Sequence, residues 1–174
     1  MINKIFSTMV ALCATIVYMP AGAQTSSASA QSASAGAQSA NSQSRATEDS
    51  IKAAVNLLFT GMIQSDPSLI RQSFTDSAIL QTIFEKDGSN VARLESIDDF
   101  ARAISRMGKG DADERIRIDV LRIDGPLAIV WAPYSFYYKG KLNHCGVDSF
   151  QLLLVNGVWK IQYLIDTRRK QPCQ

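Results

Sequence analysis

The sequence contains few of the residues that bind metals or nucleic acids. It has 1 histidine and 3 cysteines, without the paired spacing of a zinc site, so we expect neither a bound metal nor a cofactor. Its 18 Lys and Arg residues nearly balance its 16 Asp and Glu residues, which argues against a polyanionic partner. The basic run at residues 168–170 is short and is explained by a solvated strand end. We therefore expect no nucleic-acid partner.

Long apolar runs are also missing. Residues 5–19 form an apolar stretch that ends at a proline and is shorter than the roughly 20 residues that span a bilayer. Lys4 precedes this stretch and Ala21-Gly22-Ala23 follows it, which is the pattern of a cleaved signal peptide. We expect residues 1–23 to be a signal peptide and the protein to be exported, either to the periplasm or to the medium, with no membrane span.

The composition divides the rest of the chain into a linker, one domain and a tail. Residues 24–46 contain almost only Ser, Ala, Gln, Gly, Asn and Thr, so they have no large apolar side chains to offset the entropy of ordering. This predicts a disordered linker. Residues 47–170 are enough for one domain with one apolar core, and residues 171–174 form a C-terminal tail.

Three helices are predicted in the domain. Apolar residues recur at helical spacing after Thr47, and they are Ile51, Ala54, Val55, Leu58 and Met62. Asp66-Pro67 supplies a cap and a proline at the first helical position of a short second helix, which ends near Phe74. Ser96 and Asp99 have the spacing of a capping box for a third helix.

Six strands are predicted around the third helix. Before it come residues 78–84 and 91–94, and after a polar loop at 108–114 come residues 115–123, 127–138, 142–155 and 158–167. Asn156-Gly157 is a strong two-residue hairpin turn, because both residues tolerate a positive φ.

The order of these elements, with the segment WAPYSFYYKGKLNHCGVDSFQLLLVNGVWKIQYLIDTRR, resembles the nuclear transport factor 2-like superfamily. Within it the chain is similar to exported domains of the lumazine-binding and polyketide cyclase-like kinds. The resemblance covers roughly residues 47–169. It implies an α+β fold in which a cone-shaped, curved antiparallel sheet is wrapped round three N-terminal helices, in the order ααββαββββ. It also implies a pocket at the open end of the cone, although a fold does not by itself determine a function.

The hairpin turn predicts the register of the last two strands. One face carries three facing pairs, which are Leu154 with Trp159, Leu152 with Ile161, and Phe150 with Tyr163. This apolar face is expected to be the core face. Alternation then places Asp148 and His144 on the same face, opposite Ile165 and Arg169.

Asp148 and His144 are therefore candidate polar anchors in an apolar pocket. The pattern V-D-x-F at residues 147–150 resembles the place where ketosteroid isomerase carries its oxyanion-binding acid. The other groups of that enzyme have no counterpart, since the first helix lacks a tyrosine and strand 78–84 lacks a carboxylate. The alternatives are a hydrogen-bonded structural aspartate and a histidine that is exposed at the strand end.

Aromatic residues crowd the strand at 127–138, and some of them must face inward, where they can stack on a ligand. The ligand-binding candidates are Trp131 and Tyr134 on this strand and Tyr163 on the last one. Because Pro133 cannot donate a ladder hydrogen bond, a bulge there would exchange the two faces of the strand, so the inward residues stay open. Ordinary core packing is the alternative for each aromatic residue.

The favoured function is that of an exported domain that binds a small apolar or aromatic molecule, with Asp148 and His144 orienting it. One alternative is an isomerase, dehydratase or cyclase that uses Asp148 or His144 as acid or base. Another is a structural or dimer-forming domain whose cone is filled by its own side chains. Binding is favoured because catalysis needs two converging titratable groups and the sequence supplies one inward acid.

Two contacts are expected away from the pocket. Cys145 and Cys173 are the two cysteines that remain after cleavage, and an exported compartment favours a disulfide between them over two free thiols. A homodimer is expected through the outer sheet face, where the register places Val147, Leu153 and Leu164.

Overall fold

The computed structural model describes residues 27–173, so the predicted signal peptide lies outside the described residues. The chain divides into two compact units, residues 1–39 and 40–174. Of the first unit, the structure describes only the helical backbone from Ser27. Among the described helices, none is long and apolar enough to cross a membrane. The second unit contains the sheet and everything described below.

Helix α1 (Ser27–Gln64) starts earlier than the predicted start at Thr47. Helical backbone thus occupies most of the stretch for which the composition predicts a disordered linker. The segment is rich in Ala and Gln, which are strong helix formers, and it contains no proline. In the second unit the predicted apolar stripe of α1 is buried, and its buried members are Ile51, Val55, Leu58 and Met62.

The two short helices are capped as their sequences predict. Asp66 precedes α2 (Pro67–Ser73), and its Oδ1 accepts a hydrogen bond of 2.8 Å from the backbone N–H of Ser68. Ser96 precedes α3 (Ile97–Ser105), and its hydroxyl oxygen accepts from the backbone N–H of Asp99. Each cap satisfies an N–H that has no partner within its helix.

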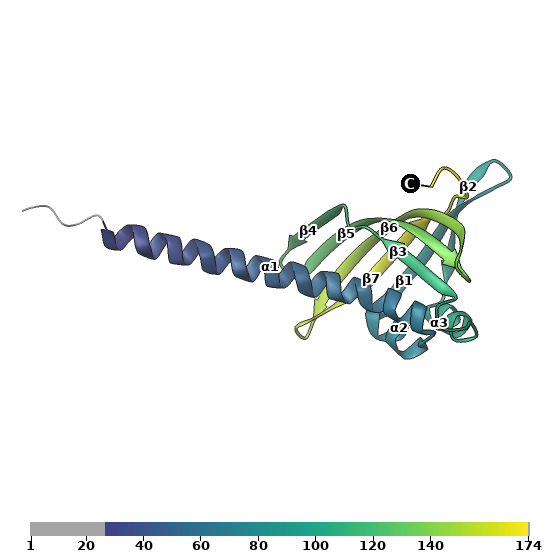
Figure 1. Cartoon of the computed structure of the whole chain (residues 1–174), viewed down its shortest axis with the longest axis horizontal. Helices are drawn as coiled ribbons and strands as arrows, with labels where there is room; N and C mark the ends of the chain where they lie inside the picture. The colour runs from purple at the N-terminus through teal and green to yellow at the C-terminus, as the bar shows by residue number, and fades with distance from the viewer. Residues whose placement is uncertain (1–26, 174) are drawn as a thin grey trace, which may run out of the picture. The chain divides into compact units, whose positions relative to one another are not determined.

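The seven strands form one sheet in the order β2-β1-β7-β6-β5-β3, with β4 also paired to β5 (Figure 1). The strands are β1 (Phe74–Lys86), β2 (Ser89–Glu95), β3 (Ala112–Ile116), β4 (Val120–Asp124), β5 (Leu127–Tyr138), β6 (Lys141–Val155) and β7 (Val158–Thr167). The sheet is mixed rather than purely antiparallel, because β1 pairs with β7 in parallel. Strand β1 is connected to β7 by β2, α3 and strands β3 to β6, and β1 and β7 run in the same direction.

The predicted single strand at 115–123 is instead two strands, β3 and β4, which gives five strands after α3 rather than four. Both pair with β5, and Ile116 faces Tyr134 while Val120 faces Trp131. The three residues 117–119 between these pairs therefore stand opposite only two residues of β5, 132 and 133. Pro133 lies at this point, and because it has no N–H the ladder is interrupted there.

The register of β6 and β7 is predicted correctly at the turn and wrongly beyond it. Leu154 faces Trp159 and Leu152 faces Ile161, as expected, but Phe150 faces Leu164 instead of Tyr163. The shift occurs because Gln162 is an extra residue in β7. Beyond this bulge the even-numbered residues of β7 face inward, so Leu164 is buried in the core and is not on the outer face.

Gln162 has a structural reason to bulge. Strand β1 is itself irregular between Phe74 and Ile79 where it pairs with β7. The side chain of Gln162 accepts a hydrogen bond of 2.7 Å from the hydroxyl of Thr75 and donates one of 3.2 Å to the carbonyl oxygen of Ser77. Two irregular strands are thereby joined through one side chain.

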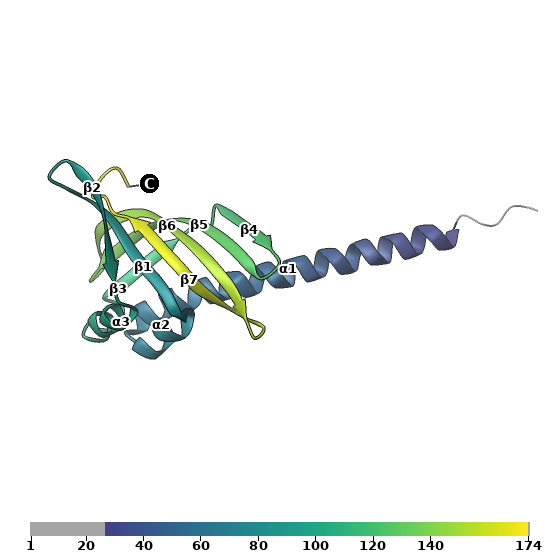
Figure 2. The ribbon, with the colours of Figure 1, turned by 180° about the vertical axis from the view of Figure 1, so that it is seen from behind.

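Helices of the second unit cover one face of the sheet. Figure 1 shows the C-terminal part of α1 in front of the sheet, with α2 and α3 beneath it. Figure 2 shows the opposite face, on which no helix of the described chain lies over β5, β6 and β7. Cys145 of β6 forms a disulfide with Cys173, with their Cα atoms 5.7 Å apart, and the bridge ties the C-terminal tail to this sheet. Cys145 pairs with Arg169, the residue that the predicted register places opposite His144.

Candidate ligand-binding site

A cavity of about 300 Å³ lies between the covered face of the sheet and helices α1 and α3. Most of its wall is apolar, formed by Leu58, Met62, Leu80, Phe100, Ile104, Met107, Phe136 and Leu164. The strands β3, β6 and β7 contribute polar groups, which are Glu114, Asp148 and Asp166 together with Asn143, His144 and Arg168. Strand β2 contributes Arg93 and Glu95. An apolar wall with a small number of polar groups is the usual composition of a small-molecule site.

Asp148 lines this cavity on β6, as the sequence predicts, and it is only 2% exposed. Its Oδ2 atom is buried and has no hydrogen-bond partner among the described residues. Burial raises the pKa of Asp148 well above its ordinary value, and the nearby carboxylates of Glu114 and Asp166 raise it further. Asp148 is therefore neutral over a wide range of pH.

Glu114 is a site residue that the sequence does not reveal, because it stands in what the polar composition predicts to be a loop. It belongs to β3, and its side chain is largely buried beside Asp148. Burial, and next the charge of Asp166, raise the pKa of Glu114 to about 7. A hydrogen bond between the two carboxyl groups raises the pKa of Asp148 and lowers that of Glu114, which identifies Asp148 as the donor and Glu114 as the acceptor.

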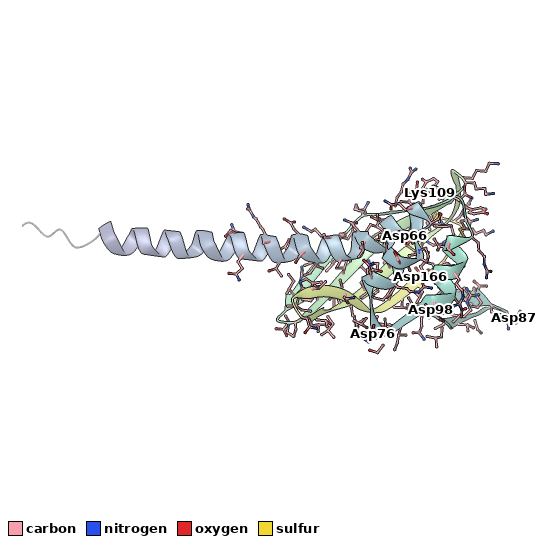
Figure 3. The ribbon with its side chains drawn as sticks, turned by 90° about the horizontal axis from the view of Figure 1, so that it is seen from below. Asp66, Asp76, Asp87, Asp98, Lys109 and Asp166 are labelled. Carbon is pink, nitrogen blue, oxygen red and sulfur yellow. A yellow bond between two sulfur atoms is a disulfide. The ribbon has the colours of Figure 1, made fainter. Side chains whose placement is uncertain are left out.

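Asp166 is the third acid, and the sequence hides it because the bulge at Gln162 turns it inward. Its Oδ1 accepts a hydrogen bond of 2.6 Å from Thr82, and its Oδ2 accepts from the hydroxyl of Tyr134 at 3.1 Å. Arg168 forms an ion pair with the same Oδ2 at 2.9 Å. Figure 3 shows Asp166 within the body of the domain, in contrast to Asp87 at the far tip of the β1–β2 hairpin. Asp166 is thus fully partnered, unlike Asp148.

His144 lies at the cavity but does not touch the acids. Its ring packs on Tyr134 and Phe136, with ring centroids 5.7 Å and 4.9 Å away, and its Nδ1 lies 2.9 Å from Oδ1 of Asn143. Burial, and next the charge of Arg168, lower the pKa of His144, so the ring is neutral at neutral pH.

The predicted aromatic candidates do not line the cavity. Trp131 is 48% exposed on the other face of β5, and Tyr163 faces away from the core because of the bulge, with its hydroxyl donating to Gln81 at 2.7 Å. Tyr134 faces inward, but its hydroxyl donates to Oδ2 of Asp166 and the residue does not line the cavity. Burial raises the pKa of its phenol far above the ordinary value. Phe136, two residues further along β5, is the aromatic residue of this strand that does line the cavity.

Glu114 and Asp148 form a hydrogen-bonded pair of acids at the cavity. Among the residues that the structure describes, no three His, Cys, Asp or Glu side chains converge closely enough to hold a metal ion. Glu114 releases its proton near pH 7, and Asp148 keeps the proton that it donates to the carboxylate of Glu114.

Several solved structures share this fold at low sequence identity. An NTF2-like protein from Shewanella baltica OS155 superposes with a TM-score of 0.59 at 18% identity, over 72% of this chain and 95% of that one. An NTF2-like protein from Silicibacter pomeroyi DSS-3 gives 0.56 at 17% identity, over 72% and 98%. A domain with a cystatin-like fold from Nostoc punctiforme PCC 73102 gives 0.57 at 15% identity, over 72% and 79%. All three are described as having unknown function, and at these identities the likeness establishes the fold alone.

The sequence itself matches one family model. The match covers residues 46–162, from the start of the domain to the last strand, and the family carries the description "Putative lumazine-binding". No curated protein matches the chain. The match covers most of the domain, so the chain belongs to the family described as putative lumazine-binding, and its fold is the one found in NTF2-like proteins.

Proposed function

We propose that the domain binds a small molecule in the cavity between the sheet, α1 and α3. The observation that carries this proposal is Asp148, a buried acid whose Oδ2 has no partner in the described protein although it faces an apolar cavity. Leaving a buried polar atom unpaired costs about 1–3 kcal/mol, which a ligand group can recover. The family description supports ligand binding in general and does not identify the ligand of this chain.

Binding is tested with prodan, a neutral naphthalene dye whose fluorescence rises in an apolar site. The protein should enhance prodan fluorescence, and Ala103→Phe should abolish the enhancement, because Ala103 lies on the exposed side of α3 and lines the cavity. Ala53→Phe, at an exposed position of α1 that does not line the cavity, is the matched control. Equal fluorescence for all three proteins would contradict binding in this cavity.

We also propose that the protein is exported and loses residues 1–23. The supporting observations are the n-region, apolar stretch and small-residue site of the sequence, together with the disulfide between Cys145 and Cys173. Intact mass and N-terminal sequencing of protein from a bacterial periplasm should give a chain that begins at Gln24. A full-length chain that stays in the cytoplasm would contradict export. Native mass spectrometry of the same material would reveal a ligand that the domain retains.

A second candidate function is acid–base catalysis, and the specific observation in its favour is the Glu114–Asp148 pair. Two converging titratable groups now face one apolar cavity, with the pKa of Glu114 near the working pH of an enzyme. The carboxylate of Glu114 would remove a proton next to a carbonyl, and neutral Asp148 would donate a hydrogen bond to the enolate oxygen.

Catalysis of this kind is tested with 2-tetralone, an apolar bicyclic ketone, in deuterated buffer. Exchange of its α-protons, followed by NMR, should be faster with the protein than without it and should be lost in Glu114→Gln. Glu95→Gln is the control, because Glu95 is another carboxylate at the same cavity. Exchange at the buffer rate with the wild-type protein would exclude this activity for the probe, and binding would remain the function supported.

A further inference from the structure

The charges at the cavity do not balance locally. Asp166 has its own cation, since Arg168 lies 2.9 Å from its Oδ2, and it receives two further hydrogen bonds from Thr82 and Tyr134. Glu114 and Asp148 take part in no ion pair among the described residues. The two acids are linked by a hydrogen bond from Asp148 to Glu114. A positive charge is the missing partner of this pair.

The other charged groups around the pair do not supply that charge. Those that line the same cavity or border it are Arg93 and Glu95 of β2, Tyr134 of β5, His144 of β6, and Asp166 with Arg168 of β7. Arg93 lies over the ring of Phe84 at 5.6 Å from its centroid, and Arg168 is taken by Asp166. His144 is bonded to Asn143 and held neutral.

The unpaired atom indicates what kind of group is missing. Asp148 Oδ2 is an acceptor in a side chain that is 2% exposed, so it calls for a donor. Glu114 is likewise an acceptor once it is ionised. The groups that offer two or more N–H donors with a positive charge are ammonium, guanidinium and amidinium. The rest of the wall is apolar, which requires that such a group be attached to an apolar body.

We propose that the cavity binds an organic cation, with an ammonium or amidinium head on the Glu114–Asp148 pair and an apolar body against α1, α3 and Leu164. This inference rests on the proposed binding function and adds the class of ligand. The cation donates to the ionised carboxylate of Glu114 and to Oδ2 of Asp148, and Asp148 keeps its proton. Binding therefore releases a proton when both acids are protonated beforehand.

The test compares 2-naphthamidine, 2-naphthamide and 2-naphthoate by calorimetry, because these probes share one apolar body and differ in charge. The amidine should bind at least about tenfold more tightly than the amide at pH 8, as charge-assisted hydrogen bonds in a buried site give. The naphthoate should bind most weakly. The affinity of the amidine should rise by about tenfold for each pH unit as the pH is raised toward 7, and it should level off above pH 7, whereas the affinity of the amide should not change.

Variants separate the acid pair from the rest of the cavity. Glu114→Gln should reduce the preference for the amidine to near unity and remove its pH dependence, and it should leave the amide bound. Glu85→Gln, at an exposed carboxylate of β1 that does not line the cavity, should change neither. If Glu114→Gln does not fold, the pH profile and the ratio of amidine to amide affinity of the wild-type protein still test the preference for a cation.

The outcomes distinguish this inference from the function on which it rests. Equal or tighter binding of the amide or the naphthoate overturns the cation inference and leaves small-molecule binding in place. Failure of all three probes and of prodan to bind overturns both. A preference for the amidine that persists unchanged in Glu114→Gln also overturns the inference, since the charge would then be recognised elsewhere.

Discussion

At the scale of single residues, Glu114 gives the protein a stability that falls as the pH rises. A carboxyl group whose pKa is raised in the folded state holds its proton more tightly there than in the unfolded chain, so stability decreases from its ordinary pKa of 4.5 toward about 7. Glu114→Gln mimics the protonated acid and removes this decrease. Its advantage over the wild type should grow by about 2.5 kcal/mol between pH 5 and pH 8, since one pKa unit corresponds to about 1.4 kcal/mol.

Urea unfolding of both proteins at a series of pH values measures this difference. His144 contributes a pH dependence of the opposite sign, because its pKa is lowered, but it is present in both proteins and cancels in the comparison. A constant difference across the range would show that Glu114 titrates with its ordinary pKa.

Gly146 permits the close approach of β6 and β7 beside the acid cluster. A Cβ atom at this position would lie 1.7 Å from the carbonyl oxygen of Thr167 and 2.8 Å from the ring of Tyr134. Gly146→Ala should therefore destabilise the protein by about 3 kcal/mol, through backbone shifts that a packed core resists. Gly140→Ala is the control, because it has open space and a positive φ of 73° and should cost only about 1 kcal/mol. Thermal unfolding measures the loss of stability in the two variants. Equal losses would mean that β6 and β7 can move apart at little cost.

These residues also show how far the sequence predicts the site. Alternation from the hairpin turn places Asp148 and His144 at the cavity correctly, because no irregularity separates them from the turn on β6. Asp166 is missed because the bulge at Gln162 reverses the faces of β7, and a bulge of one glutamine leaves no mark in the hydrophobic pattern. Glu114 is missed because β3 is short and polar, and only its pairing with β5 makes it a strand.

At the scale of elements, the bulge itself is held by a side chain. Gln162 bonds to Thr75 and Ser77 of β1, so Gln162→Ala would leave a hydroxyl and a carbonyl oxygen without those partners. We expect a loss of about 1–2 kcal/mol. Gln151→Ala, on the neighbouring strand and exposed, should cost almost nothing. Chemical denaturation provides the comparison, and a loss as small as that of Gln151→Ala would show that backbone pairing alone maintains the bulge.

The disulfide ties the last residues to β6, and the sequence predicts it from compartment and cysteine count. Closing a loop between residues 145 and 173, with a separation of 28, stabilises the fold by roughly 3 kcal/mol in the chain-entropy model. Cys173→Ser should lower stability by about this amount and leave a free thiol at Cys145. Peptide mass spectrometry without reduction checks the bridge itself, and two free thiols in periplasmic protein would contradict it.

At the scale of the whole molecule, the order of elements is what makes the family recognisable from sequence. Helix and turn signals predict α2, α3 and the hairpin well, since caps and Asn-Gly turns are local features. The parallel pairing of β1 with β7 and the division of β3 from β4 are not local, so they appear only in the structure. The make-up of the predicted dimer face depends on the same long-range register, and Leu164 is not part of that face because it is buried.

The predicted homodimer should use the sheet face that no helix of the described chain covers. Leu164 is buried inside the domain and cannot contribute, but four apolar side chains lie exposed on neighbouring strands, namely Leu127, Ile129, Trp131 and Leu153. Trp131 is the largest of them and is 48% exposed. A patch of this kind is a typical association surface, and an aromatic residue near its centre contributes most to binding.

Trp131→Lys should therefore convert dimers into monomers, as measured by light scattering at high concentration. Val91→Lys, at an exposed apolar position of β2, should leave the dimer intact. A wild-type protein that is monomeric throughout would contradict the dimer, and a dimer that survives Trp131→Lys would place its interface on another face.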